Sequence, residues 1–196
     1  MQWSKHSYMN FEEYLNYFEQ LILNPAQYPV YQDEHYYSYA KLNWSRTNRW
    51  LNKFEPSGET KSLIASITEA QTWIIITEPW CGDAAHSVPQ LINIAESNPN
   101  IKVEIQLRDE EPFLIDQYLT NGGKSIPKLI IRNESNEDIG VWGPRPEKLQ
   151  DLFLKWKEEG VEFDELKEAI QKWYNADKGS EIQDDIVKLL SLVTNS

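Results

Sequence analysis

Apolar residues in the first part of the chain recur at intervals of three and four, the spacing of one helix face. Between residues 10 and 24 this stripe predicts an amphipathic helix, which Pro25 and Pro29 end because proline cannot continue the backbone ladder. A second helical pattern runs from about Asp33 to Phe54. Together they predict an N-terminal helical pair. For the aromatic segment "YPVYQDEHYYSYAKLNW" we favour packing between helices over a ligand-stacking surface.

The middle of the chain changes to the pattern of buried strands. Ser57 is placed to cap a short helix that runs to about Thr68. The segment "TWIIIT", residues 72–77, then predicts a strand covered on both faces. A helix from Cys81 to about Ser97 and the alternating strand "IKVEIQL", residues 101–107, follow. Strand, helix and strand in this order predict a parallel pair with a right-handed crossover.

The last part of the chain completes the predicted sheet. We expect a helix in "EPFLIDQYLT", residues 111–120, ended by "NGG", and a strand in "IPKLIIR". The short polar turn "NESNED" leads to "IGVWG" and requires an antiparallel pair. Helices are then expected over residues 146–159, 164–175 and 180–193, the last with Ser180 as its cap.

These elements predict an α/β protein with a mixed four- to five-stranded sheet flanked by helices and with extra N- and C-terminal helices. We expect one domain over residues 1–196. Residues 1–56 would form an N-terminal helical extension, residues 57–159 the core, and residues 160–196 a C-terminal helical extension.

Composition and charge exclude several function classes. Acidic residues outnumber basic ones 31 to 19, and the net charge of -12 with no basic cluster argues against nucleic-acid binding and against anionic lipid surfaces. We expect neither a signal peptide nor a membrane span. One cysteine permits no internal disulfide, which suits a cytoplasmic location. Because His6, His35 and His86 lack ligand spacing, we expect no metal, and we expect no other cofactor.

Cys81, the only cysteine, lies where the predicted strand turns into a helix. The free N–H groups and the dipole of a helix start lower a thiol pKa, whereas the carboxylate of Asp83 in the same turn opposes the thiolate. Trp80 would flank the sulfur, and Gly82 would let a partner's backbone approach. We favour an accessible, reactive thiol over a small buried hydrophobic side chain. His86 is poorly placed as a base, about 140° around the helix from Cys81, and we expect a solvated or core histidine there.

The segment "PWCGDA", residues 79–84, resembles the thioredoxin active site, and "SIPKLI", residues 125–130, resembles the cis-proline segment of that fold. With the element order and the later "WGPRP", the chain resembles a bacterial "WCGD" branch of the thioredoxin superfamily. The resemblance covers residues 57–159 and implies a cis bond before Pro127. It also implies that the backbone of Ile126 docks an extended partner. For Arg145 in "WGPRP" we favour a role in the turn over anion binding or pairing with a local carboxylate.

The chain departs from the thioredoxin pattern at two positions. Ala84 stands where dithiol relatives have their second cysteine, and Ile75 stands where many thioredoxins bury an aspartate that assists proton transfer. The resemblance therefore implies monothiol exchange at Cys81 with a disulfide or oxidised thiol, on a protein or a low-molecular-weight thiol, completed by an external thiol. A non-catalytic thioredoxin-like module that binds a protein or peptide and a thiol-based oxidation sensor are the alternatives. The oligomeric state is left open.

Overall fold

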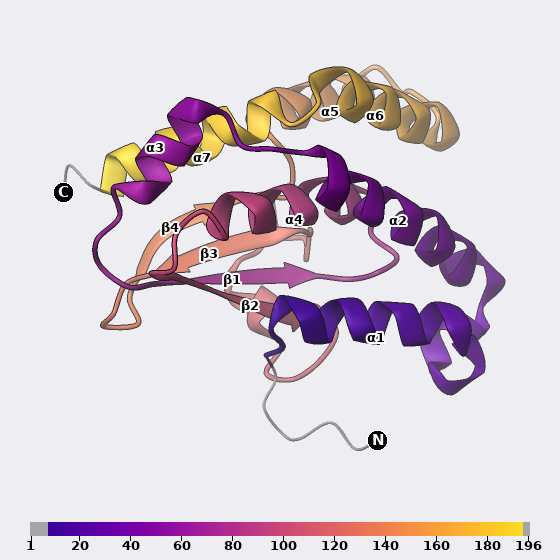
Figure 1. Ribbon diagram of the computed structural model, residues 1–196. Helices are drawn as coiled ribbons and strands as arrows, with labels where there is room; N and C mark the ends of the chain where they lie inside the picture. The colour runs from indigo at the N-terminus through magenta and orange to yellow at the C-terminus, as the bar shows by residue number, and fades with distance from the viewer. Residues whose placement is uncertain (1–7, 194–196) are drawn as a thin grey trace.

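A four-stranded mixed sheet forms the centre of the protein, and the computed structural model describes residues 8–193 (Figure 1). The strands are β1 (Gln71–Thr77), β2 (Ile101–Leu107), β3 (Lys128–Arg132) and β4 (Asp138–Trp142), in the order β2-β1-β3-β4. β1 pairs with β2 in parallel and with β3 in antiparallel, and β3 pairs with β4 in antiparallel. The predicted mixed sheet with a final antiparallel pair is confirmed, with four strands.

The central strand β1 is covered on both faces, as its run of isoleucines predicts. Ile75 pairs with Ile105 on one side and Leu129 on the other, and it has no exposed surface. Its neighbours Ile74 and Ile76 point to the opposite face and are equally buried. Because side chains alternate along a strand, burial at all three positions requires packed elements on both sides of the sheet.

Seven α-helices flank the sheet within the described residues. They are α1 (Phe11–Leu23), α2 (Glu34–Lys53), α3 (Gly58–Ala65), α4 (Gly82–Ala95), α5 (Glu147–Glu158), α6 (Phe163–Asp177) and α7 (Ser180–Val193). The first helix begins with a capping box, in which Asn10 and Glu13 each bond the other's backbone N–H, and Ser57 caps α3 as predicted. Ser180 lies inside α7, and the carboxylate of Asp177 accepts the N–H of Glu181 in its place.

The prediction of a helix over residues 111–120 is wrong. The chain forms only a short 3-10 helix there, Leu114–Gln117, because Phe113 directly before it has a left-handed backbone with φ of 54°. The side-chain amide of Gln106 also donates to the carbonyl of Leu107, which supports a turn at the end of β2. Two further 3-10 turns, Pro25–Gln27 and Pro29–Gln32, connect α1 to α2.

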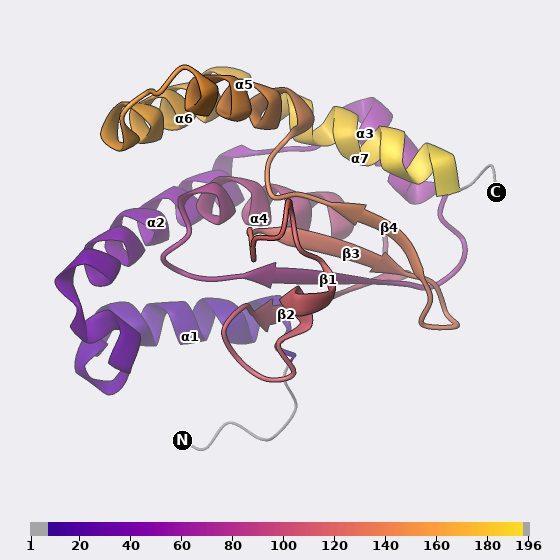
Figure 2. The same cartoon turned by 180° about the vertical axis from the view of Figure 1, so that it is seen from behind.

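Helices from both ends of the chain pack around α4 and the sheet. α2 packs along α4, and α5 and α6 form a hairpin that lies on the same side of the sheet as α4, as both views show (Figures 1 and 2). α1 packs on α2, where the Phe18 and Trp44 rings meet edge to face. α7 packs on β4, with Leu189 against Gly140. Elements far apart in the sequence therefore surround the start of α4.

His86 joins three of these helices. Its Nδ1 accepts a hydrogen bond from Trp50 Nε1 of α2 at 2.8 Å, its Nε2 lies 3.2 Å from the side-chain oxygen of Gln171 in α6, and its ring stacks on Tyr174 at 4.3 Å. The residue is 2% exposed, and burial lowers its pKa to about 3. His86 is thus a neutral core histidine, one of the two roles expected for it.

The turn from β4 into α5 approaches the segment before β3 very closely. Gly143 has φ of +109°, and a Cβ atom at this position would lie 2.3 Å from the carbonyl oxygen of Pro127. A side chain is therefore excluded both by the backbone conformation and by the contact. This glycine places Arg145, two residues later, beside the segment that contains Pro127.

We expect Gly143→Ala to lower the free energy of unfolding by about 3 kcal/mol, since strain and a backbone clash act together. Urea unfolding followed by far-UV circular dichroism measures the change. Gly58→Ala is the matched control, because a Cβ at Gly58 meets nothing within 4 Å, and it should be neutral or stabilising. Equal effects of the two substitutions would contradict the close approach at Gly143.

His86 should make the protein less stable as the pH falls. Its folded pKa of about 3 lies below its unfolded value, so the unfolded chain takes up the proton first. The stability that depends on the neutral ring is fully present above about pH 6.5 and is lost as the pH falls toward 3. We expect His86→Gln to reduce the slope of unfolding free energy between pH 6 and 4 by about 1.4 kcal/mol per pH unit. Urea titrations across this range test it, and parallel slopes would refute the assignment.

Candidate functional site

Cys81 occupies the N-cap position of α4, directly after the loop that follows β1. Its N–H donates to the carbonyl of Glu78 at 3.0 Å, which closes a tight turn. The side chain of Asn43, in α2, donates to the carbonyl of Pro79 at 3.0 Å and is itself fully buried. The loop that carries the cysteine is thus fixed from both sides, by its own turn and by α2.

The thiol of Cys81 points to the segment before β3. Its Sγ donates to the carbonyl oxygen of Ile126 at 3.4 Å, and the peptide bond between Ile126 and Pro127 is cis. Cys81 is 8% exposed and Ile126 5%. The expectation of an exposed thiol is therefore wrong, because most of the surface of Cys81 is buried by neighbouring elements.

The environment of Cys81 favours the neutral thiol. Burial first, and the charge of Asp83 second, raise the pKa of the Cys81 thiol to about 12. The N–H groups of Ala84 and Asp83 and the guanidinium of Arg145 lower this pKa, but by less. The predicted opposition between helix start and Asp83 is present, and desolvation, which the sequence analysis did not weigh, decides its outcome.

Asp83 and Arg145 form a buried ion pair beside the cysteine. Arg145 Nη2 lies 2.6 Å from Asp83 Oδ2, and the two side chains are only 15% and 10% exposed. The hydroxyl of Tyr174 donates to the other carboxylate oxygen at 3.1 Å, and the guanidinium lies 4.0 Å from the centre of the Phe153 ring. Burial raises the pKa of Asp83, and the charge of Arg145 opposes that shift. Arg145 thus ties the turn before α5 to the start of α4.

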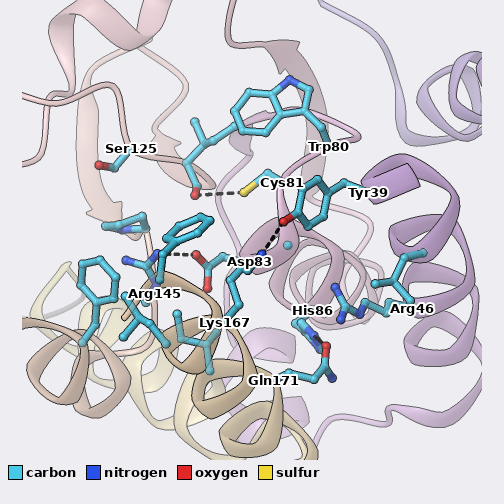
Figure 3. Close-up of a pocket in the computed structure, with 18 of the residues that line it drawn as sticks. Tyr39, Arg46, Trp80, Cys81, Asp83, His86, Ser125, Arg145, Lys167 and Gln171 are labelled. Carbon is cyan, nitrogen blue, oxygen red and sulfur yellow. Dashed lines mark hydrogen bonds and ion pairs between the residues drawn. The ribbon is translucent and has the colours of Figure 1, made fainter. Parts of the chain in front are cut away.

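A pocket of about 1070 Å³ opens above Cys81 (Figure 3). Its floor is formed by the start of α4 and by Ser125 and Ile126 of the segment before β3. One wall comes from α2, including Tyr39 and Arg46, and the opposite wall from α5 and α6. The volume lies at the upper end of the range for small-molecule sites.

The two walls of the pocket are joined by a direct bond. Lys167 Nζ of α6 donates to the hydroxyl of Tyr39 of α2 at 2.7 Å, and the same ammonium pairs with Asp164 at 2.7 Å. The packing interpretation of the aromatic segment therefore holds only in part. Tyr31 is buried in the core, whereas Tyr36 and Tyr39 line the pocket.

The remaining predicted site residues lie around the sulfur in different environments. Trp80 is half-buried in the pocket wall, with the guanidinium of Arg108 4.6 Å from its ring centre. Gly82 lines the pocket and has room for a Cβ atom, 3.9 Å from Arg46 Nη1. Ala84 is 3% exposed and faces the core beneath Cys81. The structure therefore brings Trp80, Cys81 and Gly82 together at the pocket and places Ala84 below it.

Sequence analysis missed one buried carboxylic acid next to the cysteine. Glu78 is 6% exposed, accepts a hydrogen bond from the N–H of Asp109 at 3.2 Å, and has its pKa raised by burial to about 7. Burial first, and the charge of Glu78 second, raise the pKa of the Tyr14 and Tyr17 hydroxyls of α1. The position of Glu78 directly after a buried strand was the available signal. Also missed were pocket residues from outside the predicted core: Arg46, Lys167 and Gln171.

Neither a metal cluster nor a membrane helix is found in the described part of the chain. Among residues 8–193, no three histidine, cysteine, aspartate or glutamate side chains are arranged to hold a metal ion. His35 packs on Tyr39 at 4.8 Å, and His6 lies outside the described residues. No helix in the same range combines the length and the apolar character that a membrane crossing requires.

Comparisons with known proteins agree with the fold. No curated protein matches the chain. A protein of unknown function from Pseudomonas aeruginosa has a similar structure, with a TM-score of 0.58, 17% identity, and coverage of 76% of this chain and 84% of the other. An HIV epitope-scaffold is similar with a TM-score of 0.57, 15% identity, and coverage of 79% and 90%. At these identities the two structures support the fold alone.

The family evidence comes from the sequence model described as Thioredoxin, which matches residues 30–182. This match runs from the 3-10 turns before α2, through Cys81 and Pro127, to the start of α7. It therefore includes the floor of the pocket and both of its walls. With most of its length matched, the chain belongs to the thioredoxin family.

Proposed function

We propose that this protein is a thioredoxin-fold binding protein, whose pocket above Cys81 holds a small ligand while the cysteine rests as a neutral thiol. The observation that carries the proposal is the hydrogen bond from Cys81 Sγ to the carbonyl of Ile126 on the pocket floor. A thiolate has no proton to donate, so this bond stabilises the thiol. It also occupies an acceptor that would otherwise face an incoming group.

The depth of the site supports a small ligand rather than a folded protein partner. Cys81 lies on the floor of a pocket between α2 and the α5–α6 hairpin, and it is 8% exposed. Disulfide exchange with a folded protein requires the attacking sulfur to reach the disulfide in line. Walls on two sides restrict that approach, whereas a molecule smaller than the cavity of about 1070 Å³ can enter.

Two of the groups that dithiol relatives use for turnover are replaced in this chain. Ala84 provides no second thiol, and Ile75 provides no carboxyl group at the position where many thioredoxins have one. An oxidation sensor likewise needs an activated sulfur. On the ground of its single cysteine, we propose a reducing, cytoplasmic location.

Monothiol exchange is the second candidate, favoured by the N–H groups of Asp83 and Ala84 that face Cys81 Sγ and lower its pKa. In that reaction the Cys81 thiolate attacks one sulfur of a small disulfide, the S–S bond breaks, and the leaving thiolate takes up a proton from water. An external thiolate then attacks the mixed disulfide and releases Cys81. The two candidate functions differ in the protonation state of Cys81 in the unreacted protein: a neutral thiol for ligand binding and a thiolate for exchange.

The pH dependence of Cys81 alkylation separates them. We expect the rate with iodoacetamide to keep rising above pH 10 with no plateau near neutrality, because burial and Asp83 hold the thiol pKa near 12. A Cys81→Ser protein is the blank, since Cys81 is the only cysteine. A midpoint below the ordinary ~8.5 would overturn the resting-thiol proposal and favour exchange.

Replacing Asp83 should activate the sulfur. Asp83→Asn removes the carboxylate that raises the Cys81 pKa and frees the charge of Arg145, which lowers it. We expect the thiol pKa to fall by at least about one unit, and alkylation at pH 9 to become about tenfold faster. Asp164→Asn is the matched control, because it removes another carboxylate of the same pocket. Equal rates in the two variants would show that Asp83 does not hold the thiol neutral.

A further inference from the structure

The pocket above Cys81 differs in charge from the rest of the protein. The whole chain has 31 acidic and 19 basic residues. The residues that line the pocket include seven lysines and arginines but only three aspartates and glutamates. More than a third of all basic side chains are thus gathered at one cavity of an acidic protein. A cavity that concentrates one sign of charge attracts ligands of the opposite sign.

The three acidic groups of the pocket are all neutralised by neighbours. Arg145 pairs with Asp83 at 2.6 Å, as described above. Lys167 pairs with Asp164 at 2.7 Å, and Lys172 pairs with Glu168 at 2.9 Å. Both partners of each pair line the pocket, so the opposite charges of each pair cancel within it. Of the four remaining pocket cations, Arg108 and Lys124 pair with Asp109 and Asp116 outside the lining, at 2.6 and 2.7 Å. Within the described part of the chain, Arg46 and Lys157 are left without an ion-pair partner.

Arg46 is the most confined of these remaining cations. Within the described part of the chain no carboxylate lies within 4.0 Å of its guanidinium, whose Nη1 instead donates to the side-chain oxygen of Asn43 at 3.1 Å. Burial, together with the charge of Arg49, lowers the pKa of Arg46. A partly buried guanidinium without a counter-charge is stabilised by any anion that reaches it.

The position of Arg46 adds a second source of positive potential. Its Nη1 lies 3.9 Å from the place where a Cβ of Gly82 would stand, so the guanidinium is beside the first turn of α4. The start of this fourteen-residue helix carries the positive end of the helix dipole. The one carboxylate in that turn, Asp83, is paired with Arg145. An anionic group at this point would contact both Arg46 and the helix start.

The rest of the pocket surface is largely apolar, with aromatic rings on both walls, and suits an apolar body. Tyr36 and Trp80 meet edge to face on one side, with ring centres 5.9 Å apart. Phe153 and Phe163 come from the opposite wall, and Phe163 is 66% exposed. Exposed aromatic side chains at the rim of a cavity are typical of ligand sites rather than of a finished core.

We propose that this pocket binds a small organic anion, in which a carboxylate, sulfonate or phosphate group contacts Arg46 beside the start of α4 and an aromatic or apolar body lies against Trp80 and Tyr36. The inference rests on the proposed binding function and names its ligand class. Arg46 fixes the anionic end through its bond to Asn43, which also holds the loop before Cys81. Ligand recognition and the position of the cysteine therefore share one side chain.

Two dyes that differ by one charged group test the ligand class. The probes are 8-anilinonaphthalene-1-sulfonate and its uncharged counterpart N-phenyl-1-naphthylamine, titrated into the full chain and followed by dye fluorescence. We expect the sulfonate to bind at least about tenfold more tightly than the amine. Arg46→Gln should weaken the sulfonate about tenfold and leave the amine unchanged. Lys61→Gln, a charge change on α3 outside the pocket, is the control and should alter neither.

A third variant tests whether the dyes bind in the pocket. Leu42 lines the pocket mouth from α2 and is 48% exposed, so Leu42→Trp narrows the entrance without disturbing the core. It should weaken both dyes. If both dyes bind equally and Arg46→Gln changes neither, the anion inference is overturned while the binding function stands. If neither dye binds, or if Leu42→Trp leaves both titrations unchanged, the pocket is not the binding site and the proposed function fails as well.

Discussion

The buried pair of Asp83 and Arg145 is the interaction on which the rest of the site depends. It joins the first turn of α4 to the turn before α5, and breaking such a pair by removing one partner leaves a charge stranded in a low-dielectric region. The pair also acts on Cys81, because the charge of Asp83 raises the thiol pKa and the charge of Arg145 lowers it. The pair thus holds the turn before α5 beside α4, whereas burial is the main reason why the Cys81 thiol is neutral.

Helices α2, α5 and α6 determine how accessible the cysteine is. α2 and the α5–α6 hairpin stand on either side of the start of α4, so the sulfur lies at the bottom of a cavity. The loss of a second thiol at Ala84 and the burial of Cys81 then agree with each other. Both favour a protein that holds a ligand near the thiol over one that passes electrons between partners.

The periodicity of hydrophobic residues was sufficient to predict most of the fold, because the burial pattern of β1 and of the amphipathic helices is visible in their own residues. It failed at residues 111–120, where the left-handed backbone of Phe113 depends on surrounding contacts rather than on composition. The exposure of Cys81 was also mispredicted, since its cover comes from elements distant in the sequence. Arg145 was recognised in "WGPRP", but its partner Asp83 lies 62 positions earlier, and no local pattern relates the two.

The bond between Lys167 and Tyr39 makes the cavity a joint property of two chain segments that lie more than a hundred positions apart. A ligand held between these walls would contact both segments, and its binding free energy would add to the stability of the folded chain by mass action. The outer helices, rather than the central sheet, are therefore the part of the molecule that a bound ligand would stabilise most directly.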